Sequence, residues 1–173
     1  MEKIYNESDF SSIKKQKKKY LAVYFVVLGI YAIASVGVWI AYFLQPYKSP
    51  DIWWIKLICF VLAGIFVIFS FIYLGIPFKR VRNYCKLLKG IEVGTSNGTV
   101  GEFDRYGSEL EVRDGLEFST LYFLEYNTKK QEFFERKVWM DTEKKPPEFE
   151  KGEHIKVYTH GNVLVGFDRL LDM

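Results

Sequence analysis

The sequence is poor in the residues that metal sites and disulfide frameworks need, with two cysteines and two histidines among 173 residues. Cys59 lies inside a long apolar run and Cys85 in the basic segment after it, so they form neither a secreted disulfide framework nor a metal-ligand cluster. We interpret both as small buried or interfacial thiols. His154 and His160 flank one predicted strand, and at a rise of about 3.3 Å per residue they would lie about 20 Å apart, too far to share an ion. We therefore predict no metal site.

Motifs for catalysis and cofactor binding are also lacking. No serine or cysteine has the local pattern of an activated nucleophile. The stretch GTSNGTVG at residues 94–101 lacks the lysine and the following helix that a phosphate-binding loop requires. We predict no catalytic residue and no cofactor. An enzyme that uses His154 or His160 in an unrecognised pocket is the least favoured alternative.

Charge is nearly absent from two long runs. Residues 20–44 hold no charged side chain, and residues 53–77 hold only Lys56, in the first turn of that run. About 20 apolar residues cross the hydrocarbon core of a bilayer as a helix, so the runs predict a transmembrane helical hairpin over residues 20–77 with a short polar turn. A cleaved signal peptide is the alternative for the first run, but that run is too long and lacks a small-residue cleavage site. Neither run contains an acidic residue, a histidine or an arginine, so a self-sufficient pump or transporter is not expected.

Lysine and arginine gather on both sides of the hairpin instead. They predict a basic N-terminal segment over residues 1–19 and a basic juxtamembrane helix over residues 78–90. Because positive charge near helix ends is retained in the cytoplasm, we expect a cell-membrane protein with two spans and both termini cytoplasmic. The flanks have two interpretations: they only fix the topology, or they also bind anionic lipids. The candidate lipid contacts are Lys14, Lys15, Lys17, Lys18, Lys19, Lys79, Arg80 and Arg82.

Small residues indicate where the two helices could pack. Ala34, Gly37 and Ala41 recur at helical spacing on one face, and small residues let helix backbones approach closely in lipid. In an antiparallel hairpin, Ala63 and Gly64 would lie at about the depth of Ala34. Packing within the hairpin is the favoured interpretation, and a seam between copies of the chain is the alternative.

From residue 91 onward, the apolar period changes from that of a helix to that of strands. The dipeptide Asp114-Gly115 between two alternating stretches is typical of a two-residue hairpin turn, because both residues tolerate positive φ. The pattern predicts six strands, at residues 99–104, 109–113, 116–126, 131–141, 153–159 and 163–167. Strands of this number and length favour a small antiparallel β-barrel over residues 91–173, SH3-like or OB-like, on the cytoplasmic side. The predicted fold class is an α+β membrane protein, a transmembrane hairpin followed by this barrel.

The charge of the barrel decides what it could bind. Residues 91–173 contain eleven Lys and Arg against seventeen Asp and Glu, a net charge of −6. An acidic domain repels phosphate, on which nucleic-acid affinity mainly rests, so we predict no nucleic-acid partner. Aromatic side chains often dominate the binding energy of protein interfaces. The candidate partner surface consists of Tyr122, Phe123, Phe133, Phe134 and Trp139, of which strand alternation lets only some face outward.

The C-terminal stretch FEKGEHIKVYTHGNVLVGF carries a resemblance to a known family. Its apolar-x-x-Gly-acidic turn and alternating strand consist of Phe149, Gly152, Glu153, Ile155 and Val157. This last quarter of the chain resembles the closing strands of the OB-like barrels in NfeD-like proteins, which are bacterial membrane proteins with more helices than the two predicted here. The resemblance implies an accessory role that binds a partner.

Together these observations favour an integral membrane accessory or adaptor protein. Its partners would be the lipid bilayer and either a second protein or further copies of the chain. The alternative is a subunit of a membrane transport or secretion assembly that is engaged through its helices, for which Gly37 and Gly64 are the motivation.

Overall fold

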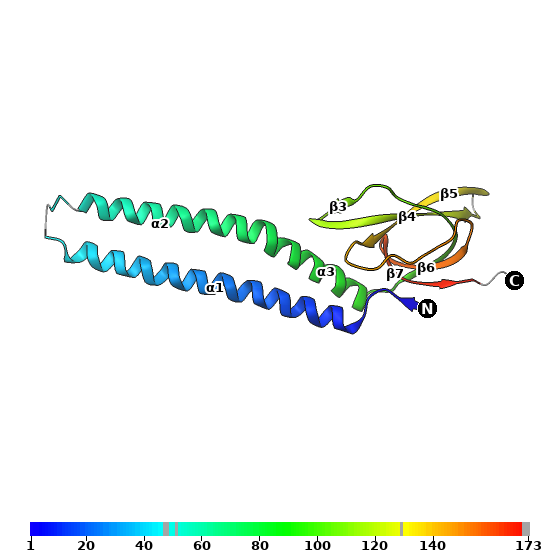
Figure 1. Ribbon diagram of the computed structural model, residues 1–173, viewed down its shortest axis with the longest axis horizontal. Coiled ribbons are helices and arrows are strands. Elements are labelled where there is room, and N and C mark those ends of the chain that lie inside the picture. The colour runs from blue at the N-terminus through cyan, green and yellow to red at the C-terminus, as the bar shows by residue number, and fades with distance from the viewer. Residues whose placement is uncertain (47–48, 51, 129, 171–173) are drawn as a thin grey trace. The chain divides into compact units, whose positions relative to one another are not determined.

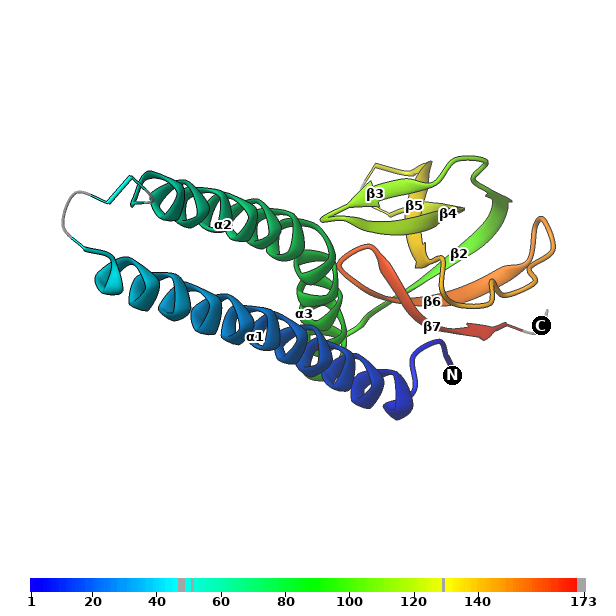
Figure 2. The ribbon, with the colours of Figure 1, turned by 60° about the vertical axis from the view of Figure 1, so that its left-hand side comes forward.

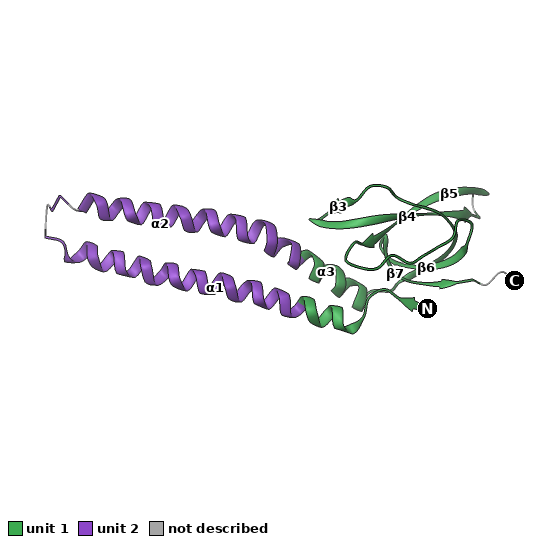
Figure 3. Ribbon diagram, viewed as in Figure 1, with its two compact units in different colours: residues 1–13, 83–173 green, residues 14–82 purple. Residues whose placement is uncertain are grey.

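A computed structural model describes residues 1–46, 49–50, 52–128 and 130–170. These residues form two long apolar helices and a mixed sheet of seven strands, of which the first precedes the helices and six follow them, and this fits the predicted α+β class. The chain divides into two compact units (Figure 3): the helical unit, residues 14–82, and the β unit, residues 1–13 together with 83–173. The predicted turn between the helices contains residues 47, 48 and 51, which lie outside the described residues.

Helix α1 (Glu7–Leu44) begins well before its apolar run. Asp9 caps its start, since the Asn6 main-chain N–H donates to the Asp9 carboxylate at 2.8 Å, which is one of the two bonds of a capping box. The lysine-rich stretch that follows consists of good helix formers, so the helix continues through it into the apolar run. Helix α2 (Ile52–Tyr73) runs back antiparallel to α1 (Figure 1). Both helices are long and apolar enough to cross a membrane, and their most apolar 18-residue windows contain no buried residue.

Aromatic side chains join the two helices. Tyr31 stacks on Phe66 with ring centroids 4.2 Å apart, and Tyr24 stacks on Phe69 at 6.4 Å. The Tyr73 hydroxyl donates to the main-chain carbonyl oxygen of Tyr20 at 3.0 Å. Such aromatic pairs contribute about 0.5–1.5 kcal/mol each beyond the burial of their surface. The hairpin is therefore held mainly by rings near the N-terminal half of the first apolar run.

A π-helical turn, η1 (Leu74–Phe78), follows α2 and leads into α3 (Lys79–Val93). Pro77 lies inside this turn. Proline has no N–H, and its ring collides with the carbonyl group four residues earlier, so a regular α-helix would be interrupted there. The wider π turn accommodates the proline where the apolar run ends and the basic segment begins.

The strands lie close to the positions that the sequence predicts, with one short addition at the N-terminus. Figure 2 shows strands β2 to β7. They are β1 (Glu2–Lys3), β2 (Asn97–Tyr106), β3 (Glu111–Arg113), β4 (Leu116–Asn127), β5 (Glu132–Asp141), β6 (His154–His160) and β7 (Val163–Arg169). Their order in the sheet is β1-β7-β5-β4-β2-β6, with β3 paired to β4. The β5–β7 pairing is parallel, at the single residue pair Trp139↔Val163. The sheet is therefore mixed, which corrects the prediction of a purely antiparallel one.

The strand pairings return to their starting point, because β6 also pairs with β7. The pairs β7–β5, β5–β4, β4–β2, β2–β6 and β6–β7 thus form a circuit around one core. Alternating residues of these strands point into it, as strand geometry requires. The core consists of Phe103, Leu121, Phe123, Val138, Met140, Phe149, Ile155, Val157, Leu164 and Phe167.

The N-terminal segment packs on the β unit. Strand β1 pairs with β7, Glu2 opposite Phe167, and the Ile4 N–H donates to the Val165 carbonyl oxygen at 3.0 Å. Lys144 forms an ion pair with Asp9 at 2.6 Å. Although burial opposes it, the Asn6 N–H and the Lys144 ammonium together hold the pKa of Asp9 below its usual value. These contacts explain why residues 1–13 belong to the β unit.

The buried Tyr5 and the half-buried Tyr84 lie in the same region. Tyr84 on α3 donates a hydrogen bond to the buried carboxylate of Asp141. Burial and this hydrogen bond raise the pKa of Tyr84 above 10.0. Burial, and then the charges of Asp141 and Asp9, likewise raise the pKa of Tyr5.

Candidate functional site

The longest hairpin of the sheet, β4–β5, carries the candidate site at its tip. Its ladder runs without interruption from Phe118↔Asp141 to Asn127↔Glu132. Near the first pair, inward-facing side chains are buried, but the residues of β5 from 132 to 135 are all exposed. The hairpin therefore extends from a packed base to an exposed tip.

The outer edge of β5 lacks a neighbouring strand over most of its length. In an antiparallel ladder, every second residue directs both its N–H and its C=O to the same side. The Trp139 N–H donates to the Asn162 carbonyl oxygen at 2.7 Å, on the side away from β4. The main-chain groups of Phe133, Glu135 and Lys137 therefore face the same way, and no main-chain partner for them occurs in the part of the chain that the structure describes. We call residues 133–137 the β5 edge.

Exposed aromatic side chains surround this edge. Phe133 is 70% exposed and Tyr126, opposite it on β4, is 51% exposed. Their rings meet edge to face with centroids 5.1 Å apart. Phe134, on the other face of β5, is 40% exposed. Exposed large apolar side chains grouped at one place are typical of interaction surfaces.

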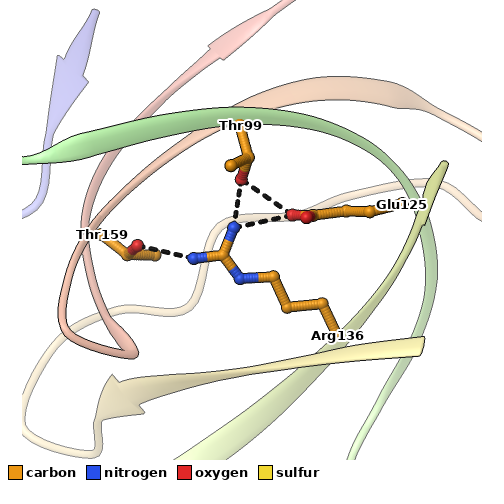
Figure 4. A network of polar contacts seen from close by, with 4 residues as sticks. All are labelled: Thr99, Glu125, Arg136 and Thr159. Atoms are coloured by element: carbon orange, nitrogen blue, oxygen red, sulfur yellow. Dashed lines mark hydrogen bonds and ion pairs between the residues drawn. The ribbon is translucent and has the colours of Figure 1, made fainter. Parts of the chain in front are cut away.

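A polar network surrounds the Arg136 side chain, on the inward face of β5 (Figure 4). The Arg136 guanidinium pairs with the Glu125 carboxylate at 2.7 Å and donates to the Thr159 hydroxyl at 2.8 Å. It also donates to the Thr99 hydroxyl, which in turn donates to Glu125 at 2.7 Å. The four side chains come from β5, β4, β6 and β2. Arg136 thus links β5 to β6 through side chains, at the place where main-chain pairing between β5 and its neighbour has ended.

The fold buries or covers part of the predicted partner surface and leaves the rest exposed. Phe123 is fully buried in the core and is not available to a partner. Tyr122 lies under the Arg105 guanidinium, 4.4 Å from the ring centroid, and Trp139 lies under Arg113 at 3.7 Å. Only Phe133 and Phe134 of the five predicted residues are largely exposed, and both lie at the β5 edge.

The small residues of the helices also differ in their exposure. Ala34 and Ala63 are half-buried in the helical unit, whereas Gly37, Ala41 and Gly64 are exposed. A Cβ atom placed on Gly37 or on Gly64 would meet nothing within 4 Å among the described residues. The outward-facing glycines therefore take no part in packing within the hairpin.

The basic residues of the flanks are nearly all exposed. Only Lys17 is half-buried among the predicted lipid contacts, which were Lys14, Lys15, Lys17, Lys18, Lys19, Lys79, Arg80 and Arg82. Of the histidines, His154 is exposed. The His160 ring lies against Gly90 of α3 and against Gly94, which directly follows α3. A Cβ at Gly90 would come within 2.9 Å of that ring, so the glycine permits the contact. No group of three metal-ligating side chains occurs among the residues that the structure covers.

Sequence reasoning did not identify the Arg136 network or the open main-chain groups of the β5 edge. One signal was present: Arg136 and Glu125 occupy inward positions of alternating strands, where apolar residues are the rule. Comparisons with known protein families, with characterised proteins and with solved structures gave no match.

Proposed function

We propose that the chain is an integral membrane adaptor whose β unit binds another protein through the β5 edge. The helical unit is the anchor in this proposal. Its two apolar runs, uncharged apart from Lys56, fit the thickness of a bilayer, and neither run contains a fully buried side chain.

The composition of the β unit supports a specific topology. Residues 1–13 and 83–173 belong to one compact unit, so they lie on the same side of a membrane. A hairpin between them must then cross an even number of times, which two spans satisfy. The lysine and arginine residues on both flanks favour the cytoplasm for that side.

The closed circuit of strand pairings supports a small barrel as the architecture of the β unit. In a barrel, closure removes exposed strand edges, which otherwise attract other chains. Here the closure at β5 rests on one main-chain pair with β7 and on the side-chain link from Arg136 to Thr159 of β6. The rest of this side of β5, with Phe133 beside it, remains open.

The observation that carries the proposal is this combination of unpaired main-chain groups and exposed rings. The N–H and C=O groups of Phe133, Glu135 and Lys137 can pair with an extended segment of a partner, as when a peptide adds a strand to a sheet. Phe133 and Phe134 then provide apolar contacts for the side chains of that segment. Residues Glu135 and Lys137 supply charges that select among partners.

A matched pair of variants at one position tests the edge. Glu135→Pro removes an N–H that faces outward, so the β4–β5 ladder keeps its hydrogen bonds. Glu135→Ala removes the same side chain, including its ion pair with Arg105, but keeps the N–H. Any difference between the two variants therefore reports on the main-chain edge and not on the carboxylate.

The readout is photo-crosslinking in the cell's own membrane, with benzoylphenylalanine in place of Phe133. Val112, which is 67% exposed on β3, carries the same group as the positional control. We expect position 133, and not 112, to give one discrete adduct that survives Glu135→Ala and disappears with Glu135→Pro. An adduct that is equally strong in the proline variant, or equally strong from position 112, would refute binding at the β5 edge.

A further inference from the structure

A groove of about 500 Å³ lies between α3 and the β3–β4 hairpin, on the β unit. The Asn83 side-chain amide donates to the Asp114 carbonyl oxygen at 2.8 Å and so fixes the helix against the hairpin turn. The groove is lined by Asn83, Lys86, Leu87, Arg113, Asp114, Leu116, Phe118, Trp139 and Val163. None of these residues belongs to the β5 edge.

The lining of the groove combines cations with an apolar floor. Lys86 is exposed at one wall and Arg113 at the other, and Asp114 is the carboxylate among the lining residues. Arg113 also lies 3.5 Å from the Glu111 carboxylate, which is outside the lining. Lys86, on α3, gives the lining its excess of positive charge, whereas Arg113 and Asp114 belong to residues 91–173, whose net charge is −6. By contrast, the groove beside Tyr122 balances two cations against Glu109 and Glu111.

Trp139 adds an aromatic ring to the same site. This ring lies 3.7 Å below the Arg113 guanidinium, and its indole N–H is buried. The stacked ring holds the Arg113 charge at the wall of the groove. Two cations beside apolar side chains suit an anionic group attached to an apolar body.

We propose that this groove binds an anionic phospholipid. Its phosphate would lie between Lys86 and Arg113, and the first part of an acyl chain would lie along Leu87, Leu116 and Val163. Asn83 follows Pro77, the end of the second apolar run, by only six residues, so a bilayer lipid is the available source. The inference goes beyond partner binding, and it relies on the proposed membrane location only for that source.

The test uses the full chain in detergent with Trp39, Trp53 and Trp54 replaced by phenylalanine. Trp139 is then the single tryptophan, and its emission reports binding at the groove. The probes are dihexanoyl phosphatidylglycerol, dihexanoyl phosphatidylcholine and inorganic phosphate. Because each is soluble, the result depends on neither a bilayer nor a protein partner.

Two double variants separate the groove from charge in general. Lys86→Gln with Arg113→Gln removes both cations of the groove, and both side chains are exposed. Arg105→Gln with Lys137→Gln is the matched control, since those two cations lie over the Tyr122 ring at 4.4 and 5.9 Å. Each variant thus loses two positive charges from the lining of one groove.

We expect phosphatidylglycerol to bind about tenfold more tightly than phosphatidylcholine, as two nearby cations imply. This preference should persist in the Arg105/Lys137 control and vanish in the Lys86/Arg113 variant. Equal affinity for the two lipids, or a preference that survives in the Lys86/Arg113 variant, would overturn the proposal. Inorganic phosphate that binds as tightly as phosphatidylglycerol would also overturn it, because the apolar floor would then contribute nothing.

Discussion

Arg136 places a positive charge at an inward position of β5, two residues from the buried Val138. Taking the charges of Arg136 and Glu125 out of water costs several kcal/mol for each, and their attraction offsets this cost only when the other donors and acceptors are also satisfied. Thr99 and Thr159 supply those additional hydrogen bonds. The four side chains therefore stabilise the β unit as a set.

Loss of one charge from this set is expected to lower the stability of the β unit. Arg136→Met leaves Glu125 buried and unpaired, which should destabilise the β unit by roughly 3–5 kcal/mol. Replacing both Arg136 and Glu125 by methionine removes the uncompensated charge and should recover much of that stability. Hydrogen exchange of the β4 and β5 amides, followed by mass spectrometry on the full chain in detergent, measures both effects. A double variant that exchanges as fast as Arg136→Met would refute this account.

Tyr5 and Tyr84 make the β unit sensitive to alkali. Because the pKa values of Tyr5 and Tyr84 are raised in the folded state, the unfolded chain loses these protons first as pH rises above about 10. Their contribution to stability is complete below that pH and is lost above it. Thermal unfolding of the β unit between pH 8 and pH 11 should therefore show a falling midpoint, which Tyr5→Phe and Tyr84→Phe make less steep. Tyr126→Phe, at an exposed tyrosine, is the control, and an equal effect in this variant would count against burial as the cause.

At the scale of elements, the helical hairpin depends on its aromatic contacts. Phe66→Ala removes the ring that stacks on Tyr31 and should lower the unfolding midpoint of the hairpin, by the equivalent of about 1 kcal/mol or more. Phe71→Ala makes the same chemical change on the same helix, at a side chain that is 76% exposed. Circular dichroism during thermal unfolding in detergent distinguishes the two variants. Equal losses would mean that the rings between the helices are not what holds them.

The outward-facing glycines give a different expectation. Since nothing lies within 4 Å of a Cβ on Gly37, Gly37→Leu should leave the hairpin itself as stable as the wild type. The substitution therefore tests the alternative function, in which the helices engage another membrane protein or a second copy. Native mass spectrometry of the protein extracted in mild detergent measures whether a complex is present. If Gly37→Leu dissociates a complex that Glu135→Pro leaves intact, the helices and not the β5 edge bind the partner.

The elements that the sequence predicts well are those with a local cause. Alternation from Leu116 to Tyr126 and the Asp114-Gly115 turn depend on neighbouring residues, so the hairpins were placed nearly correctly. The parallel pair Trp139↔Val163 and the pairing of β1 with β7 join distant segments, and no local pattern reports them. The candidate site divides in the same way. The outward position of Phe133 follows from strand alternation. The unpaired edge beside it depends on where β7 stops pairing with β5, which is a long-range feature that no local pattern predicts.

At the scale of the whole molecule, the native cysteines provide a test of the proposed topology. Cys59 lies within the second apolar run and Cys85 in the basic segment after it, and no other cysteine occurs. A membrane-impermeant maleimide added to intact cells should label neither residue, because the bilayer shields the first and the second faces the cytoplasm. In inverted membrane vesicles it should label Cys85, and Cys85→Ser should abolish the signal. Labelling of Cys85 in intact cells would reverse the orientation.

The pairing of β1 with β7 also affects how the protein is made. Glu2 and Lys3 are translated before Gly166 and Phe167, with which they pair, because they come earlier in the chain. In the proposed topology, residues 1–13 are made before the hairpin inserts, and the strands that pack on them are made after it. The pairing between β1 and β7 therefore forms only once the hairpin and the strands up to β7 have been translated. A fusion at the N-terminus that delays this final pairing would act on biogenesis, before any partner or lipid is bound.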